Sequence, residues 1–299
     1  MNIRQHALWL FGLAGCLIGW SSVALADDTP CSSCANWNVS QPPFKIYGDT
    51  YYVGTHGLSS VFIASSSGHV LIDGALPESA PKIAANIREL GFRIEDVKVI
   101  LNSHVHFDHA GGLAELQRLS GAKVYASRSS AAVLRSGVAG RDDPQYAIAR
   151  PIARIKEVST VKEGDVVRVG SLQLTAHMTP GHTPGGTSWS WQSCESKRCL
   201  NMVYADSLSS VSAEEFKYTR SSEYPGGIQD FAKSFATLTA MPCDILITPH
   251  PEASGLWKKL ERRQHGAPDP FVDVNACRAY VDMAREGLAK RLDSEKASP

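Results

Sequence analysis

One short segment constrains this chain more than any other: residues 104–109, HVHFDH, directly after the apolar run Val97–Leu101. The segment holds three imidazoles and one carboxylate, the ligands that suit Zn²⁺ and other borderline first-row metals. His104 and His106 share one face of an extended segment. Asp108 and His109 then require a tight bend, which would aim them at a second point. The segment predicts a loop that feeds two adjacent metal ions, and the alternative is a polar loop with surface histidines.

Composition predicts an ordinary globular protein with no nucleic-acid partner. The 299 residues are 43% hydrophobic and 20% charged, which is enough for one large domain with a sizeable core. The formal net charge is zero, so the chain lacks the basic surface that nucleic acids or anionic membranes attract.

The first 26 residues have the pattern of a signal peptide. An apolar run, Ala7–Trp20, precedes small residues that end at Ala26, where we expect cleavage. The run is too short for a transmembrane anchor, so we expect no stable membrane insertion. The mature chain, residues 27–299, is then a single periplasmic domain. A lipid anchor at Cys16 is the alternative, but the apolar run continues beyond that cysteine, which favours cleavage.

Six cysteines remain in the mature chain, and an even number in an exported protein favours disulfides. They are Cys31, Cys34, Cys194, Cys199, Cys243 and Cys277. Six cysteines allow fifteen pairings. The middle two flank a charged turn between strand-like runs and would close a hairpin, and a bond between the last two would pin the final helix to the core. The first two could be a redox pair, but no strand–helix context surrounds them, so a structural bond is favoured.

The order of apolar patterns predicts an α/β fold. Strands are expected at 44–47, 50–54, 60–64, 70–73, 97–101, 123–126, 155–158, 166–169, 172–179, 187–192, 200–205 and 245–248. Helices are expected at 77–90, 113–119, 129–135, 228–239, 256–262 and 275–292. Residues 138–153 lack periodicity and predict a long surface loop. Two such halves, packed sheet to sheet with helices outside, give a four-layer αβ/βα sandwich of two mixed sheets.

Three more polar segments stand just beyond apolar strands, as HVHFDH does. They are PGHTPGG with His182, ADSLS with Asp206, Ser207 and Ser209, and PHP with His250. Because ligands gather outside the carboxyl ends of strands, we expect these segments to converge on one edge. A histidine that caps a turn is the alternative for His182 and His250. The remaining histidines lack such a context and are interpreted as non-ligands: His6, His56, His69, His177 and His265.

Together, HVHFDHAGG, PGHTPGG, YADSLS and TPHP resemble the metallo-β-lactamase superfamily, and most of all its class B, subclass 3 β-lactamases. Three features carry that likeness: histidines at every ligand position of the first metal, a serine after Asp206 in place of a cysteine ligand, and Cys243 and Cys277, which match a disulfide of the subclass. The resemblance implies two Zn²⁺ ions, one bound by His104, His106 and His182 and the other by Asp108, His109 and His250.

The resemblance also implies roles around the metals. Asp108 would be catalytic as well as a ligand, orienting the nucleophile and passing its proton on. Ser207 would contact metal-bound water and Ser209 the substrate carboxylate, although hydrogen bonding within a turn explains both serines equally well. Asp206 is not interpreted as a ligand.

The implied activity is hydrolysis of the β-lactam amide by a metal-activated hydroxide, in a monomer that confers antibiotic resistance. Penicillins, cephalosporins and carbapenems are the expected substrates, and the choice among them would depend on loops near Trp37 and Val138–Ala153. A thioesterase of the glyoxalase II kind or a lactonase is the second hypothesis. A non-catalytic exported zinc-binding protein is the third.

Overall fold

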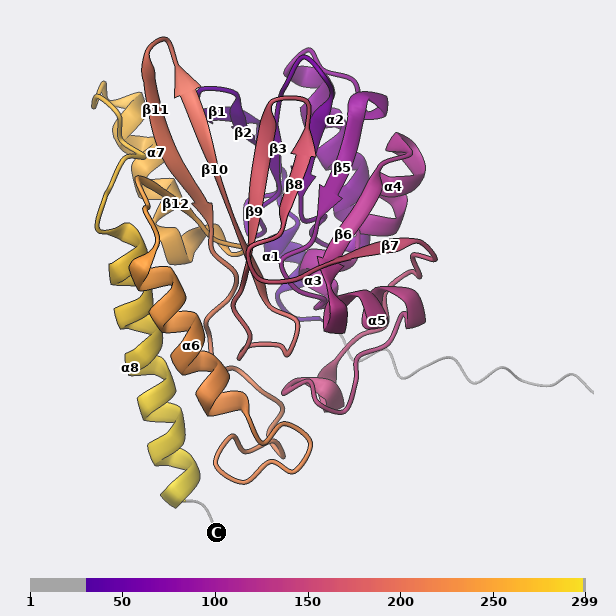
Figure 1. Ribbon diagram of the computed structural model, residues 1–299, viewed down its shortest axis with the longest axis vertical. Helices are drawn as coiled ribbons and strands as arrows, with labels where there is room; N and C mark the ends of the chain where they lie inside the picture. Colours follow the sequence, from indigo (N-terminus) through magenta and orange to yellow (C-terminus); the bar gives the residue numbers. More distant parts are fainter. Residues whose placement is uncertain (1–30, 298–299) are drawn as a thin grey trace, which may run out of the picture. The chain divides into compact units, whose positions relative to one another are not determined.

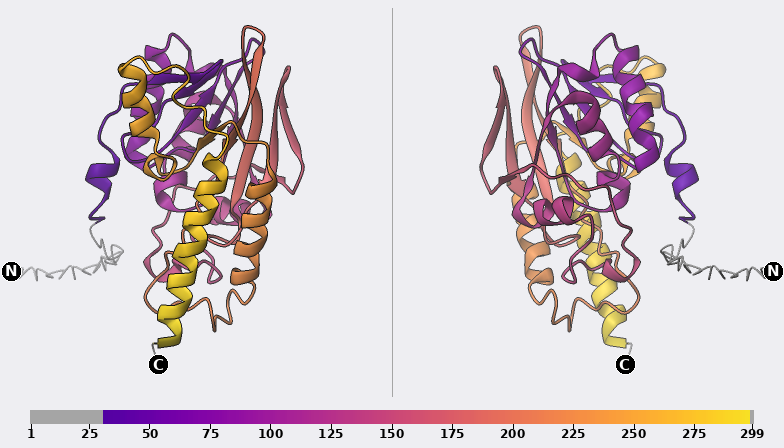
Figure 2. Two further views of the ribbon diagram at one scale, coloured as in Figure 1. Left: turned by 90° about the vertical axis from the view of Figure 1, so that its left-hand side faces the viewer. Right: turned by 90° about the vertical axis from the view of Figure 1, so that its right-hand side faces the viewer.

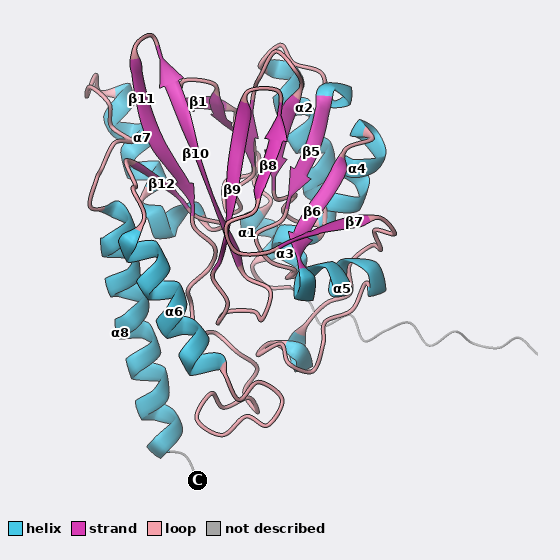
Figure 3. Cartoon of the chain, viewed as in Figure 1, coloured by secondary structure: helices cyan, strands magenta, loops and turns pink. Residues whose placement is uncertain are grey.

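Two β-sheets lie face to face, and helices cover their outer faces (Figure 1 and Figure 3). The structure, a computed structural model, describes residues 31–297. The chain divides into two units, residues 1–32 and 33–299, and all the sheets and helices given below belong to the second. The predicted four-layer αβ/βα sandwich is confirmed. The expected signal peptide and Cys16 lie outside the described residues, so the cleavage site and the domain boundary that it sets stay predictions.

The first sheet has seven strands in the order β1-β2-β3-β4-β5-β6-β7. Strands β1 to β4 pair antiparallel, and β4 to β7 pair in parallel. The bounds are β1 Phe44–Tyr47, β2 Thr50–Tyr52, β3 Val61–Ile63, β4 His69–Ile72, β5 Val97–Leu101, β6 Lys123–Ser127 and β7 Val158–Val161.

The second sheet has five strands in the order β12-β11-β10-β9-β8. Only β11 and β12 pair in parallel, and the other neighbours pair antiparallel, so both sheets are mixed, as expected. The bounds are β8 Val166–Val169, β9 Leu172–Met178, β10 Thr187–Glu195, β11 Arg198–Tyr204 and β12 Ile245–Ile247.

Long helices lie on both outer faces of the sandwich (Figure 2). Those on the first sheet are α2 Ala80–Glu89, α4 Leu113–Ser120 and α5 Arg128–Ser136, and those on the second are α6 Gly227–Ala240 and α8 Ala276–Ala297. The others are α1 Cys34–Trp37, α3 Phe107–Ala110, α7 Leu256–Gln264 and the 3₁₀ turns η1 Pro77–Ser79, η2 Ile94–Asp96, η3 Tyr146–Ile148 and η4 Pro251–Ser254. Among residues 31–297, no helix is long and apolar enough to cross a membrane.

The central strands carry continuous apolar runs where both of their faces are buried. In β11, Met202 and Tyr204 join the cluster between the sheets, whereas Val203 packs in the cluster under α6 and α8. In β4, Val70 faces the other sheet and Leu71 faces the helices. Side chains alternate along a strand, so each continuous apolar run supplies two cores at once.

One predicted strand is in the wrong place. A strand was expected at 155–158, but β7 begins where that range ends. The backbone N–H of Ile155 donates to the carbonyl of Leu134 at 2.8 Å, so Ile155 is buried against the end of α5. Pairing with β6 begins only at Val158, opposite Val124. The short helices α1 and α3 were not predicted, because one turn is too short to show a period.

Two disulfides join the elements that the cysteine contexts suggested. Cys194 and Cys199 are paired partners at the end of the β10–β11 hairpin. Cys243 is bonded to Cys277 in α8, although it precedes β12 by two residues and does not open that strand. Cys31 and Cys34 are also in the disulfide form, and their pairing with each other stays a prediction. Disulfides of this kind are typical of exported proteins.

Replacing both Cys243 and Cys277 by serine is expected to lower the free energy of unfolding by about 2–4 kcal/mol, because that bond restricts the unfolded chain across 34 residues. The matched replacement of Cys194 and Cys199 opens a link across only 5 residues and should cost less. Urea denaturation of the three proteins measures both effects. Equal losses would show that loop closure is not the dominant contribution.

Candidate metal centre

The predicted ligand segments meet at one edge of the sandwich, each beyond the end of a strand. His104 and His106 follow β5, His182 stands between β9 and β10, and His250 follows β12. The tight bend expected before Asp108 is the short helix α3. The N–H groups of His109 and Ala110 close that turn by donating to the carbonyl of His106 at 3.0 and 2.8 Å.

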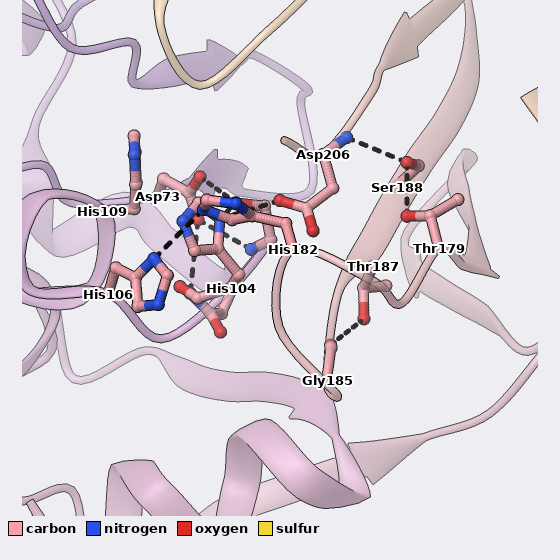
Figure 4. Close-up of polar contacts among 12 residues, drawn as sticks. Asp73, His104, His106, His109, Thr179, His182, Gly185, Thr187, Ser188 and Asp206 are labelled. Atoms are coloured by element: carbon pink, nitrogen blue, oxygen red, sulfur yellow. Dashed lines mark hydrogen bonds and ion pairs between the residues drawn. The ribbon is translucent and has the colours of Figure 1, made fainter. Parts of the chain in front are cut away.

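Three histidines, His104, His106 and His182, form a first group. One ring nitrogen of each lies within 4.8 Å of those of the other two. His106 Nδ1 and His182 Nε2 are only 3.1 Å apart. Figure 4 shows the three rings side by side. All three residues are buried, with exposed fractions of 0%, 8% and 6%.

The opposite ring nitrogen of each histidine bonds to an oxygen. The pairs are His104 Nδ1 with Asp206 Oδ1 at 2.8 Å, His106 Nε2 with both carboxylate oxygens of Asp143 at 3.1 Å, and His182 Nδ1 with the Ser209 carbonyl at 2.8 Å. Carbonyl and carboxylate oxygens accept, so the paired nitrogen is the one that carries the proton. The other nitrogen of each ring is thereby left with its lone pair for a metal.

Burial favours the neutral, metal-binding form of two of these rings. It lowers the pKa of His104 and of His182 well below the usual value, and the neighbouring histidines lower both further. Burial also lowers the pKa of His106, but the hydrogen bond and charge of Asp143 outweigh it, so the pKa is raised. Asp143 is thus the charged neighbour with the largest effect on His106.

A second group consists of Asp108, His109 and His250. Asp108 Oδ2 lies 3.2 Å from His109 Nε2 and 3.3 Å from His250 Nε2, and the two nitrogens are 3.3 Å apart. Burial raises the pKa of Asp108, but the charges and hydrogen bonds of the two histidines more than reverse this and hold the pKa well below its usual value. The carboxylate is therefore ionised at neutral pH.

Both groups fit a divalent metal by their chemistry. Imidazole and carboxylate are zinc ligands, and each group offers three of them from one small volume. Nε2 of His104 is buried and has no hydrogen-bond partner among the described residues, an arrangement that is costly unless another group uses its lone pair. Three protein ligands leave a coordination position open, as in catalytic zinc sites.

A cavity of about 200 Å³ adjoins both groups. His106, Asp108, His182 and His250 line its floor, and much of its wall comes from residues 138–153. Trp37 also lines it, with its ring centroid 5.3 Å from that of His250. The two features expected to influence substrate choice therefore border the cavity at the metal groups.

Asp206 orients a ligand and belongs to neither group. Its N–H donates to Ser188 Oγ at 2.9 Å, and its Oδ1 accepts from His104 (Figure 4). Its other oxygen faces Gly186, where an added Cβ would come within 2.5 Å of Oδ2. Gly186 therefore leaves room for the carboxylate to lie in this orientation.

Sequence reasoning missed two buried carboxylates. Asp73 accepts from the N–H and Oγ of Ser103 at 2.8 and 2.6 Å and from Tyr204 OH at 2.9 Å, so it fixes the residue before His104. Its place just after β4 was a usable signal, because the other site residues also follow strands. Asp143 lies in an aperiodic loop, where no pattern marked it.

The two serines assigned to substrate have different surroundings. Ser209 is exposed and lines the cavity at the histidines, and its Oγ lies 3.2 Å from His182 Nδ1. Ser207 is buried and lines a neighbouring groove along α8, which shares Ser209, Val211 and His250 with this cavity. The other histidines within the described residues are in neither metal group; they are His56, His69, His177 and His265.

Comparison with known proteins shows the same fold over nearly the whole chain. The metallo-β-lactamase superfamily pattern matches residues 53–195. The solved Rm3 metallo-β-lactamase is 60% identical with a TM-score of 0.88, over 89% of this chain and 99% of that one. MEM-A1, a subclass B3 metallo-β-lactamase from a soil metagenome library, is 51% identical with a TM-score of 0.86, over 88% and 100%.

Curated relatives, hydroxyacylglutathione hydrolases, match at 28–39% identity over stretches of 87 to 228 residues. A hydroxyacylglutathione hydrolase of Rhodopseudomonas palustris (strain BisB18) is 34% identical over 107 residues, which are 36% of this chain. The match spans about a third of that relative, 32% of its length.

Proposed function

The chain belongs to the metallo-β-lactamase superfamily, and we propose that it is a zinc-dependent β-lactamase that hydrolyses penicillins, cephalosporins and carbapenems and so confers resistance to them. The observation that carries the proposal is the pair of adjacent three-residue groups, one of them all histidine, within a fold that matches β-lactamases over 99% of their length. The hydroxyacylglutathione hydrolase that matches over 74% of its own length is only 28% identical, against 60% for the Rm3 enzyme.

One zinc ion would be held by His104, His106 and His182, and a second by the Asp108 group. When bound, zinc supplies Lewis acidity toward the lactam carbonyl and lowers the pKa of water from ~15.7 toward ~7. The six side chains come from three segments at one edge of the sandwich, so their relative positions depend on the sheets and not on one flexible segment.

Asp108 is the proposed catalytic carboxylate. It is ionised and lies between His109 and His250, so it can accept a proton from the attacking water and pass it toward the lactam nitrogen. Ser209, on the cavity wall, can donate a hydrogen bond to the substrate carboxylate. Ser207 is proposed to contact the nucleophilic water. Trp37 and the 138–153 loop would cover the substrate and exclude other water.

A thioesterase or lactonase is the second candidate, favoured by the similarity to hydroxyacylglutathione hydrolases. In an enzyme of that kind we would expect an aspartate between the two metals. Asp206 is the residue available for that role, but its Oδ1 bonds to His104 and its Oδ2 faces Gly186. This orientation supports the β-lactamase proposal.

We propose further that the enzyme is exported to the periplasm through a signal peptide of residues 1–26 and acts there as a monomer. The Cys194–Cys199 and Cys243–Cys277 bonds support export, because such bonds persist in oxidising compartments.

Purified mature protein is expected to hydrolyse nitrocefin and imipenem, to lose this activity when a chelator removes zinc and to regain it when zinc is restored. Absorbance assays follow both substrates, with S-lactoylglutathione measured in parallel. Turnover of the thioester alone would favour the thioesterase. No turnover of any substrate in zinc-replete buffer would favour a zinc-binding protein without catalysis.

Asp108→Ala is expected to lower kcat for nitrocefin by at least about 10²-fold, because the variant loses both a ligand and the proposed proton carrier. It should retain the fold and bind one zinc per chain instead of two. Asp96→Ala, at a half-exposed carboxylate in η2, is the matched control. Near-native turnover by the Asp108 variant would mean that the centre of the motif has been misassigned.

A further inference from the structure

A buried carboxylate in the 138–153 loop reaches the first metal group. Asp143 is only 3% exposed, although the loop around it is largely at the surface. Each of its carboxylate oxygens lies 3.1 Å from His106 Nε2. Since that nitrogen donates, His106 presents Nδ1 toward His182.

The same residue organises its own loop. The Asp143 N–H donates to the Gly140 carbonyl at 3.0 Å, and Asp143 Oδ1 accepts from the Gln145 N–H at 2.8 Å. The Asp143 carbonyl accepts from the Tyr146 N–H at 2.9 Å. One side chain thus closes a turn of the loop and contacts a candidate ligand.

This loop forms much of the wall of the cavity at the histidines. The wall residues that it contributes are Ala139, Gln145, Ile148, Ala149, Arg150 and Ile152. Gln145 also approaches the first metal group, with its Nε2 3.5 Å from His106 Nδ1. At that distance the Gln145 contact is at best weak.

We propose that Asp143 is a positioning residue that couples occupation of the first metal group to the seating of the 138–153 loop. The proposal rests on the proposed zinc binding, but not on the identity of the substrate. With an ion held at Nδ1, the His106 ring would be fixed in place and its Nε2–H would stay directed at Asp143. The carboxylate then retains a fixed donor, which holds the loop against the cavity.

Coupling of this kind acts equally in both directions. If zinc strengthens the seating of the loop, the seated loop must strengthen zinc binding by the same factor. Carboxylates that accept from metal-bound histidines typically change metal affinity by about 10–100-fold. The loss of Asp143 should therefore weaken the binding of one zinc ion, and zinc should no longer affect the seating of the loop.

Three variants distinguish this positioning role from a purely structural role in closing the turn of the loop. Asp143→Ala removes both functions of the carboxylate. Asp143→Asn keeps an oxygen for the Gln145 N–H but removes the charge that faces His106. Asp142→Asn, at the exposed neighbouring aspartate, is the matched control.

Two measurements are made on each protein, which comprises residues 27–299. Zinc affinity is measured by competition with a chromophoric chelator, and amide hydrogen exchange over residues 138–153 is measured with and without zinc. In the native protein zinc should slow exchange in the loop. In Asp143→Ala one of the two ions should bind about 10–100-fold more weakly, and loop exchange should no longer respond to zinc. Asp143→Asn should change in the same direction, and Asp142→Asn should match the native protein.

Native zinc affinity in Asp143→Ala, or loop exchange that still responds to zinc, would overturn the proposal. So would equal losses in the Asp142 and Asp143 variants. If Asp143→Ala does not fold, Asp143→Asn decides by the same criteria. If the native protein binds no zinc, the proposed function fails instead, and native zinc binding without any β-lactam turnover leaves the coupling test intact.

Discussion

The metal centre depends on the hydrogen bonds that hold the outward nitrogens of its three histidines. An imidazole binds a metal through one nitrogen, so the partner of the other nitrogen decides which way the ring faces and which atom keeps its lone pair. Here the partners are Asp206, Asp143 and the carbonyl of Ser209. All three rings consequently turn an acceptor nitrogen toward the same small volume.

These partners come from two different parts of the fold. Asp206 and Ser209 lie in the segment after β11 that leads toward α6, and Asp143 lies in the loop after α5. The sandwich brings them together because strands from both sheets end at one edge. Asp73, after β4, bonds to Ser103 and to Tyr204 at the end of β11, and so joins the two sheets directly behind His104. The contacts that join the two sheets therefore also position the residues of the site.

Sequence patterns were sufficient for those parts of the site that rest on local regularity. The HVHFDH segment and the later ligand segments each follow an apolar strand, and their convergence follows from strand ends meeting at one edge. The orientation of the histidine rings could not be predicted from the sequence, because it depends on hydrogen bonds between residues as far apart as His104 and Asp206. The role of Asp143 could not be predicted either, because it lies in a loop without periodicity and bonds to a residue far away in the sequence. The wrongly predicted strand at 155–158 has the same cause. Ile155 lies in a strand-like pattern, but contacts with α5 that are distant from any local pattern hold it outside β7.

We infer that the fold fixes the donor atoms of the first metal group before any ion binds. A crystal structure of the zinc-loaded protein, with anomalous data at the zinc edge, tests this directly. We expect an ion about 2.0–2.1 Å from His104 Nε2, His106 Nδ1 and His182 Nε2, with Asp206 and Asp143 still bonded to the opposite nitrogens of His104 and His106. An ion bound through the other nitrogen of His104 or His106, or bridged by Asp206, would contradict it.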